Sequence, residues 1–448
     1  MTAFELTIRA RRTITPEGMG GGVIAVDRGR IVAVEPVDSP LWSRGAQRVD
    51  LDDDEVLLPG LVDSHVHVND PGRTEWEGFA TATMAAAAGG VTTIVDMPLN
   101  SIPPTVDVDA LQVKRKTAEL QSYVDVGFWG GAVPGNVADL RPLHEAGVYG
   151  FKCFLVHSGV DEFPPLDARQ MLEAMREIAS FDGLLLVHAE DHNAIRRAPE
   201  PRGVSYEAFL RSRPRRAENL AVAKVIELAR RTKCRVHILH VSCSDVLPMI
   251  AFAARDGVAI TAETCPHYLT FSAEEIPDGA TQYKCCPPVR EQRNRELLWE
   301  GLRDGVLGLV VSDHSPSTAD LKCLSTGDFG AAWGGISSLQ IGLPAVWTEA
   351  GARGFSLPEV VRWMCQAPAE QTGMRRKGRI AVGADADFCV FAPDQPYLVD
   401  PNRLLHRNPI TPYTGRRLTG VVRETWLAGS RIDLSAKPRG RLLNRGDA

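Results

Sequence analysis

Histidine and aspartate side chains end several apolar segments of this sequence. His65 and His67 end VLLPGLVDSHVH, and because residues two apart in a strand point to one face, both imidazoles can reach one metal ion. Alone, this HxH pair is weak evidence, since two polar residues often simply end a strand. His188 follows LLLV, His240 follows VHIL, and Asp313 follows GLVVS. Together these residues predict a metal centre assembled from several strands.

Lys152 interrupts the apolar run YGFKCFLV, where an unpaired ammonium would be costly to bury. One explanation is a structural salt bridge. The other, which fits the pattern better, is that burial and metal charge keep the amine neutral, so that it takes up carbon dioxide and becomes a carbamate bridging two cations. In a two-metal hydrolytic site, a bridging hydroxide attacks the substrate carbonyl. Asp313 could accept the proton of the attacking water and pass it to the leaving nitrogen.

His237 provides a comparison within the same apolar run as His240. It lies three positions earlier, so strand alternation predicts that it points to the opposite face. We therefore expect an ordinary packed histidine at this position and not a metal ligand.

The elements that must position these residues form two patterns. Residues 1–54 contain short strands, and residues 55–374 alternate strand-length apolar runs with helical segments, which indicates an α/β fold with a parallel sheet. Eight such strands favour a closed (β/α)8 TIM-type barrel, whose strand ends meet at one mouth. We place those ends near His67, Asp96, Gly130, Leu155, His188, His240, Glu263 and Asp313.

Strand patterns return over residues 375–433. Neither β segment has enough strands to be stable alone, so the two chain ends are expected to form one small composite β-sandwich beside the barrel. Residues 434–448 are basic and unpatterned, and we expect a disordered tail there.

Composition excludes several functional classes. A net charge of -6 gives no reason to expect nucleic acid, so the partner should be a small-molecule substrate. Nine scattered cysteines without a CxxC pair fit neither a disulfide framework nor a cysteine zinc site, which favours the cytoplasm. Charged residues at the N-terminus leave no room for a signal peptide. Gly89 and Gly90 divide the uncharged run that could imitate a membrane span, so no membrane association is expected.

Longer motifs extend the pattern over nearly the whole chain. They are PGLVDSHVHVNDPGRTEWEGF, GGVTTIVDMPLNSIPPT, GFKCFLV, VHAE, HVS, ETCPHYL, KCCPPVR, SDHSP, WGGISSLQIGLP and HRNPITPYTGRRLTG. With these motifs the chain resembles the cyclic amidohydrolases of the urease-related superfamily, and among them the allantoinases. The resemblance implies a barrel with a composite sandwich, hydrolysis of allantoin to allantoate in purine breakdown, and a homotetramer.

The resemblance also implies a specific metal centre. It would contain two divalent ions bridged by N6-carboxylated Lys152, with further ligands His65, His67, His188, His240 and Asp313. Zinc is the first choice, and cobalt, manganese and iron remain open because histidine and carboxylate ligands suit all four.

Two positions bear on the choice of substrate. Dihydroorotases usually carry an arginine two residues after the second histidine, where it can hold the substrate carboxylate, but this chain has Asn69. A neutral amide suits allantoin, which has no carboxylate. Hydantoinases and dihydropyrimidinases usually carry a tyrosine five residues beyond the metal lysine, where this chain has His157. That histidine either stabilises the oxyanion or is an ordinary loop residue, and dihydroorotase and then hydantoinase remain the alternative activities.

Four more residues are candidates for the substrate pocket. Asn100 could hydrogen-bond the ureido group or could serve only the turn that it occupies. By resemblance, backbone groups near Cys286 and Gly334 would hold the ring, and Arg290 would support that loop. A non-catalytic scaffold related to dihydropyrimidinases is the alternative of another class, which the full set of ligand types disfavours.

Overall fold

The computed structural model describes residues 4–447, and its larger part is a closed barrel. The strands are parallel, and Val66 bridges to His314 beyond the last strand, which closes the ring. The TIM-type barrel predicted from the sequence is confirmed. Its strands are β6 (Leu61–Val66), β7 (Val91–Asp96), β8 (Asp125–Phe128) continued by β9 (Gly130–Gly131), β10 (Phe151–Phe154), β11 (Leu184–His188), β12 (Arg235–Ile238), β13 (Ile260–Thr264) and β14 (Leu309–Val310).

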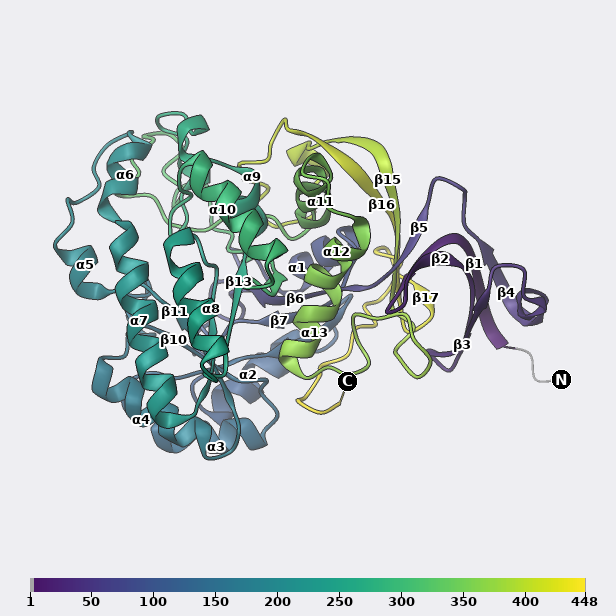
Figure 1. The fold of residues 1–448 in the computed structure, drawn as a ribbon, viewed down its shortest axis with the longest axis horizontal. Coiled ribbons are helices and arrows are strands. Elements are labelled where there is room, and N and C mark those ends of the chain that lie inside the picture. The colour runs from purple at the N-terminus through teal and green to yellow at the C-terminus, as the bar shows by residue number, and fades with distance from the viewer. Residues whose placement is uncertain (1–3, 448) are drawn as a thin grey trace.

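Helices surround these strands (Figure 1). They are α1 (Phe79–Ala88), α2 (Val108–Ala118), α3 (Val137–Glu145), α4 (Ala168–Ala179), α5 (His192–Arg196), α6 (Tyr206–Ser212), α7 (Arg215–Thr232), α8 (Leu247–Arg255), α9 (Pro266–Thr270), α10 (Gln292–Arg303), α11 (Gly342–Ala352), α12 (Leu357–Val361) and α13 (Ala367–Thr372). Helix α4 shows why these segments are helical. Asp167 and Gln170 cap its N-terminus reciprocally, and Met171, Met175 and Ile178 form its buried face.

A second sheet joins the two ends of the chain. Its strand order is β17-β16-β15-β5-β1-β2-β3, and β4 pairs with β1. Both ends of the chain contribute strands to this sheet, as the sequence predicted, because β5 from the N-terminal part pairs antiparallel with β15 from the C-terminal part. In Figure 1 the strands β1 to β4 lie at the opposite end of the molecule from α4 to α7. The strands are β1 (Phe4–Thr15), β2 (Gly18–Asp27), β3 (Arg30–Pro36), β4 (Gly45–Asp50), β5 (Val56–Pro59), β15 (Phe388–Leu398), β16 (Arg417–Leu427) and β17 (Ser430–Arg431).

Gly60 joins this sheet to the barrel. The single apolar run that precedes His65 is divided there, with β5 in the sandwich and β6 in the barrel. A Cβ atom at Gly60 would lie 2.2 Å from Oγ1 of Thr92, so only glycine fits where the chain passes from one sheet to the other.

The C-terminal segment corrects an expectation. The sequence predicts a disordered tail over residues 434–448, but in its described part, residues 434–447, Leu442 forms a parallel bridge with Val126 of β8, and Leu443 is buried. The Arg441 guanidinium lies 2.7 Å from Asp125, whose carboxylate also binds the buried Lys377. The expectation was wrong because Arg441 pairs with Asp125 and Asp385, two carboxylates that folding brings together and that a sequence pattern does not reveal.

We expect Arg441→Ala to lower the free energy of unfolding by about 1–2 kcal/mol. The substitution removes a charged hydrogen bond to the buried Asp125 carboxylate, and the effect is moderate because the Arg441 side chain is half exposed. Urea denaturation would measure this loss. The exposed Arg439→Ala is the control, and equal stability of the two variants would contradict the role of the tail contact.

The structure also bears on membrane association and on the cysteines. None of the helices within residues 4–447 is long and apolar enough to cross a membrane. All nine cysteines are free thiols.

Candidate metal centre

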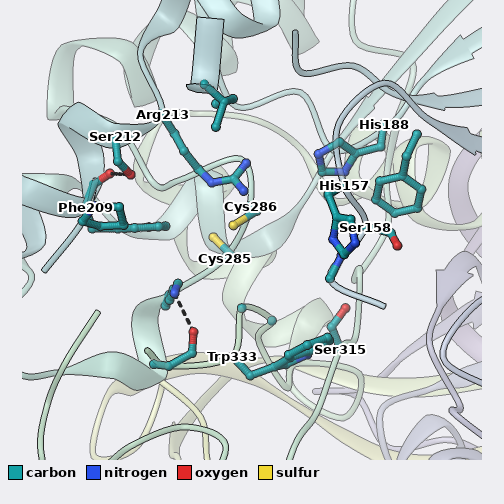
Figure 2. A pocket seen from close by; sticks show the side chains of 18 of the residues that line it. His157, Ser158, His188, Phe209, Ser212, Arg213, Cys285, Cys286, Ser315 and Trp333 are labelled. Atoms are coloured by element: carbon teal, nitrogen blue, oxygen red, sulfur yellow. Dashed lines mark hydrogen bonds between the residues drawn. The ribbon is translucent and has the colours of Figure 1, made fainter. Parts of the chain in front are cut away.

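The barrel mouth brings together the six residues that the sequence singled out as ligands. His65 lies in β6, Lys152 in β10 and His188 at the end of β11. Five of the six line one cavity of about 530 Å³, and the sixth, His65, is buried within the barrel. The five are His67, Lys152, His188, His240 and Asp313. Figure 2 shows part of this cavity, with His188 and His157 on one side and Arg213 on the other.

The imidazoles are grouped around the Asp313 carboxylate. Its Oδ1 lies 3.1 Å from Nε2 of His65 and 3.4 Å from Nε2 of His67. The rings of His188 and His240 are 4.6 Å apart, and those of His65 and His240 are 5.4 Å apart. One ligand atom from each of His65, His240 and Asp313 lies within 4.8 Å of the other two. These separations suit side chains that share metal ions.

Unpartnered ring nitrogens also fit a metal. Nε2 of His65, Nδ1 of His67 and Nδ1 of His240 are buried and have no hydrogen-bond partner among residues 4–447, since the contact between His65 and Asp313 lacks hydrogen-bond geometry. A buried nitrogen without a partner is costly, and a metal ion would satisfy it. The donor set of imidazoles and one carboxylate is the one that divalent transition metals prefer.

Lys152 is buried between these groups. Its Nζ lies 4.7 Å from the centroid of the Phe154 ring and has no ion-pair partner in the part of the chain that the structure describes. The salt-bridge explanation therefore finds no support. Burial lowers the pKa of Lys152 to about 8, although the carboxylates of Asp313 and Glu263 act in the opposite direction. The neutral form of the amine is consequently far more populated near physiological pH than it is in an ordinary lysine.

A buried chain of hydrogen bonds holds His65. Its Nδ1 lies 2.5 Å from Oε1 of Glu263, and Oε2 of Glu263 lies 2.9 Å from Nε2 of His237. His237 in turn lies 2.7 Å from Oγ1 of Thr261. Burial disfavours the ionised form of Glu263, but the two imidazoles outweigh it and lower the pKa of the carboxyl to about 2. Burial likewise opposes charging of His65, yet Asp313 and Glu263 raise its pKa to about 9.

The expected orientation of His237 was therefore wrong. Its ring joins the same carboxylate as His65 and does not face away from the site. Strand alternation failed as a guide because β12 ends at Ile238 and His240 has a φ of 36°, so the two histidines do not belong to one regular strand.

Four of the six candidate substrate residues line the cavity: Asn100, His157, Cys286 and Gly334. The side chain of His157 is 54% exposed, and its Nε2 lies 3.3 Å from Asp161. The carbonyl of Asn100 accepts a hydrogen bond of 2.8 Å from Arg73, and the φ of Asn100 is 65°, which is consistent with a role in the turn.

Asn69 and Arg290 are not among the side chains that line the cavity. Asn69 is buried with a φ of 64°, a left-handed conformation that asparagine tolerates well. Neither polar atom of its amide has a hydrogen-bond partner within the described residues. Arg290 binds the buried Glu218 at 2.6 Å, and Glu218 accepts a hydrogen bond from the backbone N–H of Cys243. Arg290 thus supports loops around the site and does not reach into it.

Sequence reasoning missed three residues of the site as functional side chains. Glu263 was identified from the sequence only as a strand end. Like Lys152, however, it is a charged residue within a strand, in the run ITAET, and this could have identified it. Glu190 accepts a hydrogen bond of 2.8 Å from His188, and it also binds Arg213, which lines the cavity. The position of Glu190 two residues after His188 could have identified it.

Comparisons with known proteins find relatives over nearly the whole chain. Residues 56–432 match the model of the Amidohydrolase family. The allantoinase of Streptomyces avermitilis is 58% identical over 448 residues, which cover 99% of this chain and 100% of the relative. The allantoinase of Saccharomyces cerevisiae is 47% identical, with 86% of each chain covered.

Solved structures show the same architecture. An L-hydantoinase (dihydropyrimidinase) from Arthrobacter aurescens superposes with a TM-score of 0.90 at 29% identity, covering 99% of this chain and 98% of the other. A D-hydantoinase superposes with a TM-score of 0.87 at 26% identity and 99% coverage of both chains.

Proposed function

Because this chain belongs to the amidohydrolase family, we propose that it hydrolyses the cyclic amide of allantoin to give allantoate, a step of purine degradation. The observation that carries the proposal is the convergence of four histidines, one lysine and one aspartate from five barrel strands at one mouth of the barrel. Similarity to allantoinases over the full length of the chain supports the choice of substrate.

Six side chains would hold two divalent ions: His65, His67, Lys152 as its carbamate, His188, His240 and Asp313. When bound, the ions would lower the pKa of a water molecule and polarise the scissile carbonyl. The unpartnered nitrogens of His65, His67 and His240 support this assignment. We propose zinc as the resident metal, since a site of imidazoles and carboxylates suits it.

Asp313 is proposed as the group that moves the proton. Burial disfavours its charged form, but the surrounding histidines lower the pKa of its carboxyl well below the usual range, so it is ionised and able to accept a proton. Ser315 donates a hydrogen bond of 3.2 Å to Oδ1 and helps to hold its orientation. From this position Asp313 would take a proton from the attacking water and deliver it to the leaving ring nitrogen.

Two sequence positions distinguish this chain from the related cyclic amidases. The position of the carboxylate-binding arginine of dihydroorotases is occupied by Asn69, and the tyrosine position of hydantoinases is occupied by the cavity-lining His157. Parallel assays on allantoin, dihydroorotate and hydantoin would test the proposal. We expect the highest kcat/KM on allantoin, and faster turnover of dihydroorotate would refute the argument from Asn69.

The low pKa of Lys152 leads to a prediction about pH. The neutral amine is the form that captures carbon dioxide, and its fraction rises as the pH passes upward through about 8, whereas an ordinary lysine would titrate near 10.5. When metal and a fixed concentration of dissolved carbon dioxide are supplied, protein stripped of metal and carbamate should therefore regain activity faster as the pH rises toward 8, and at a nearly constant rate above about pH 8.5. A rate that keeps rising about tenfold per pH unit up to pH 10 would contradict the assigned environment of the lysine.

We also propose that the enzyme is a cytoplasmic homotetramer. The free thiols are consistent with a reducing compartment, and the tetramer follows from family resemblance alone. Cell fractionation and light scattering would test the two statements separately.

A further inference from the structure

His188 and Arg213 both line the cavity, and a buried carboxylate connects them. Oε2 of Glu190 lies 2.8 Å from Nε2 of His188, and the same oxygen accepts a hydrogen bond from Nη1 of Arg213. The side chain of Glu190 is fully buried, and that of Arg213 is 18% exposed. Figure 2 shows the Arg213 side chain extending toward Cys286.

The chemistry of this contact fixes the form of the imidazole. An ionised carboxylate can only accept hydrogen bonds, so Nε2 of His188 carries a proton, and in the neutral imidazole Nδ1 then presents its lone pair. Metal-binding histidines are commonly oriented in this way by a carboxylate on the other ring nitrogen. Arg213 supplies the positive charge that makes burial of the Glu190 carboxylate tolerable.

The carboxylate that holds His65 has a different environment. Glu263 is hydrogen-bonded to His237, and His237 to Thr261, within the barrel. None of these three side chains lines the cavity. His65 is thus held by a chain of side chains inside the barrel, whereas His188 is held by an ion pair at the cavity wall. Removal of the Arg213 charge can therefore be tested without disturbing the contacts of His65.

We propose that Glu190 and Arg213 are positioning residues that hold His188 in the tautomer and orientation required of a metal ligand. The inference rests on the proposed function, since the ions concerned are those of the proposed hydrolytic centre. Arg213 acts through Glu190 and His188. Loss of Arg213 should weaken the binding of the ion that His188 ligates and leave the other ion bound.

The test is metal affinity in Arg213→Met and Arg213→Lys, measured by equilibrium dialysis and elemental analysis of the zinc-loaded protein. We expect Arg213→Met to bind one zinc ion about 10- to 100-fold more weakly than the parent protein. Arg213→Lys keeps the charge and should restore part of the affinity. The absorption spectrum of the cobalt-loaded protein should change in Arg213→Met, because the geometry around His188 changes.

The nearby Arg211→Met is a matched control, since Arg211 is exposed in α6 and pairs only with Glu207 among the described contacts. Two tightly bound zinc ions in Arg213→Met, with an unchanged cobalt spectrum, would overturn the proposal.

Arg213→Met leaves Glu190 buried without its cation and could fail to fold. The double variant Glu190→Gln/Arg213→Met removes both charges and retains a carbonyl that can accept from His188. It should fold and bind one ion more weakly, because a neutral acceptor orients the imidazole less strongly. Parental affinity for both ions in the double variant would refute the positioning role. Metal affinity is measured without substrate, so failure to hydrolyse allantoin would refute the proposed function alone.

Discussion

Lys152→Ala should lose both bound metal and activity. Lys152 is buried at the centre of the site without an ion-pair partner in residues 4–447, and its carbamate is proposed to bridge the two ions. Because bound metal supplies several kcal/mol of transition-state stabilisation, we expect kcat/KM to fall by about 10³-fold or more. Elemental analysis and allantoin assays on the same preparation would measure the two losses together.

Partial rescue distinguishes the carbamate from a purely structural lysine. A small carboxylate such as acetate can occupy the space vacated by the side chain and bridge the ions, so added acetate should restore part of both metal content and activity. Lys116→Ala is the control, because Lys116 is exposed on α2 and does not line the cavity. Full metal occupancy in Lys152→Ala would refute the bridge.

Asp313→Asn should reduce kcat by about 10²- to 10⁴-fold, the range for loss of a general acid–base group. Asparagine has the shape of aspartate but cannot accept the proton of the attacking water. The four histidines and Lys152 remain, so we expect part of the metal to stay bound, and kcat should be expressed per bound metal ion.

Asp304→Asn, at an exposed position after α10, makes the same chemical change away from the mouth and should leave kcat unchanged. The pH profile of the parent enzyme provides a second check. The Asp313 carboxyl is already ionised at neutral pH, since the surrounding histidines lower its pKa, so a profile of the parent enzyme that required a protonated Asp313 would contradict its role as the proton acceptor. A kcat per metal in Asp313→Asn within a factor of about three of the parent value would remove Asp313 from the proposed proton transfer, because such a change is far below the usual effect.

The sequence by itself determined the strands and the residues at their ends. Apolar runs of strand length can be recognised locally, and a histidine, lysine or aspartate within or after such a run is unusual enough to be noticed. The parallel α/β pattern then predicted that these residues meet at one mouth of a barrel. The residues identified in this way are His65, His67, Lys152, His188, His240 and Asp313.

Only the tertiary structure decided which groups support those residues. The contact from His65 through Glu263 to His237 joins two neighbouring strands to the first strand of the barrel, and the ion pair between Glu190 and Arg213 spans the segment that contains α5 and α6. The position of Asn69 away from the cavity and the packing of the C-terminal segment against β8 were likewise set by folding. The physical reason is that periodicity reports which residues are buried locally, whereas partners far apart in sequence are fixed by the closure of the barrel and the packing of the chain ends against it.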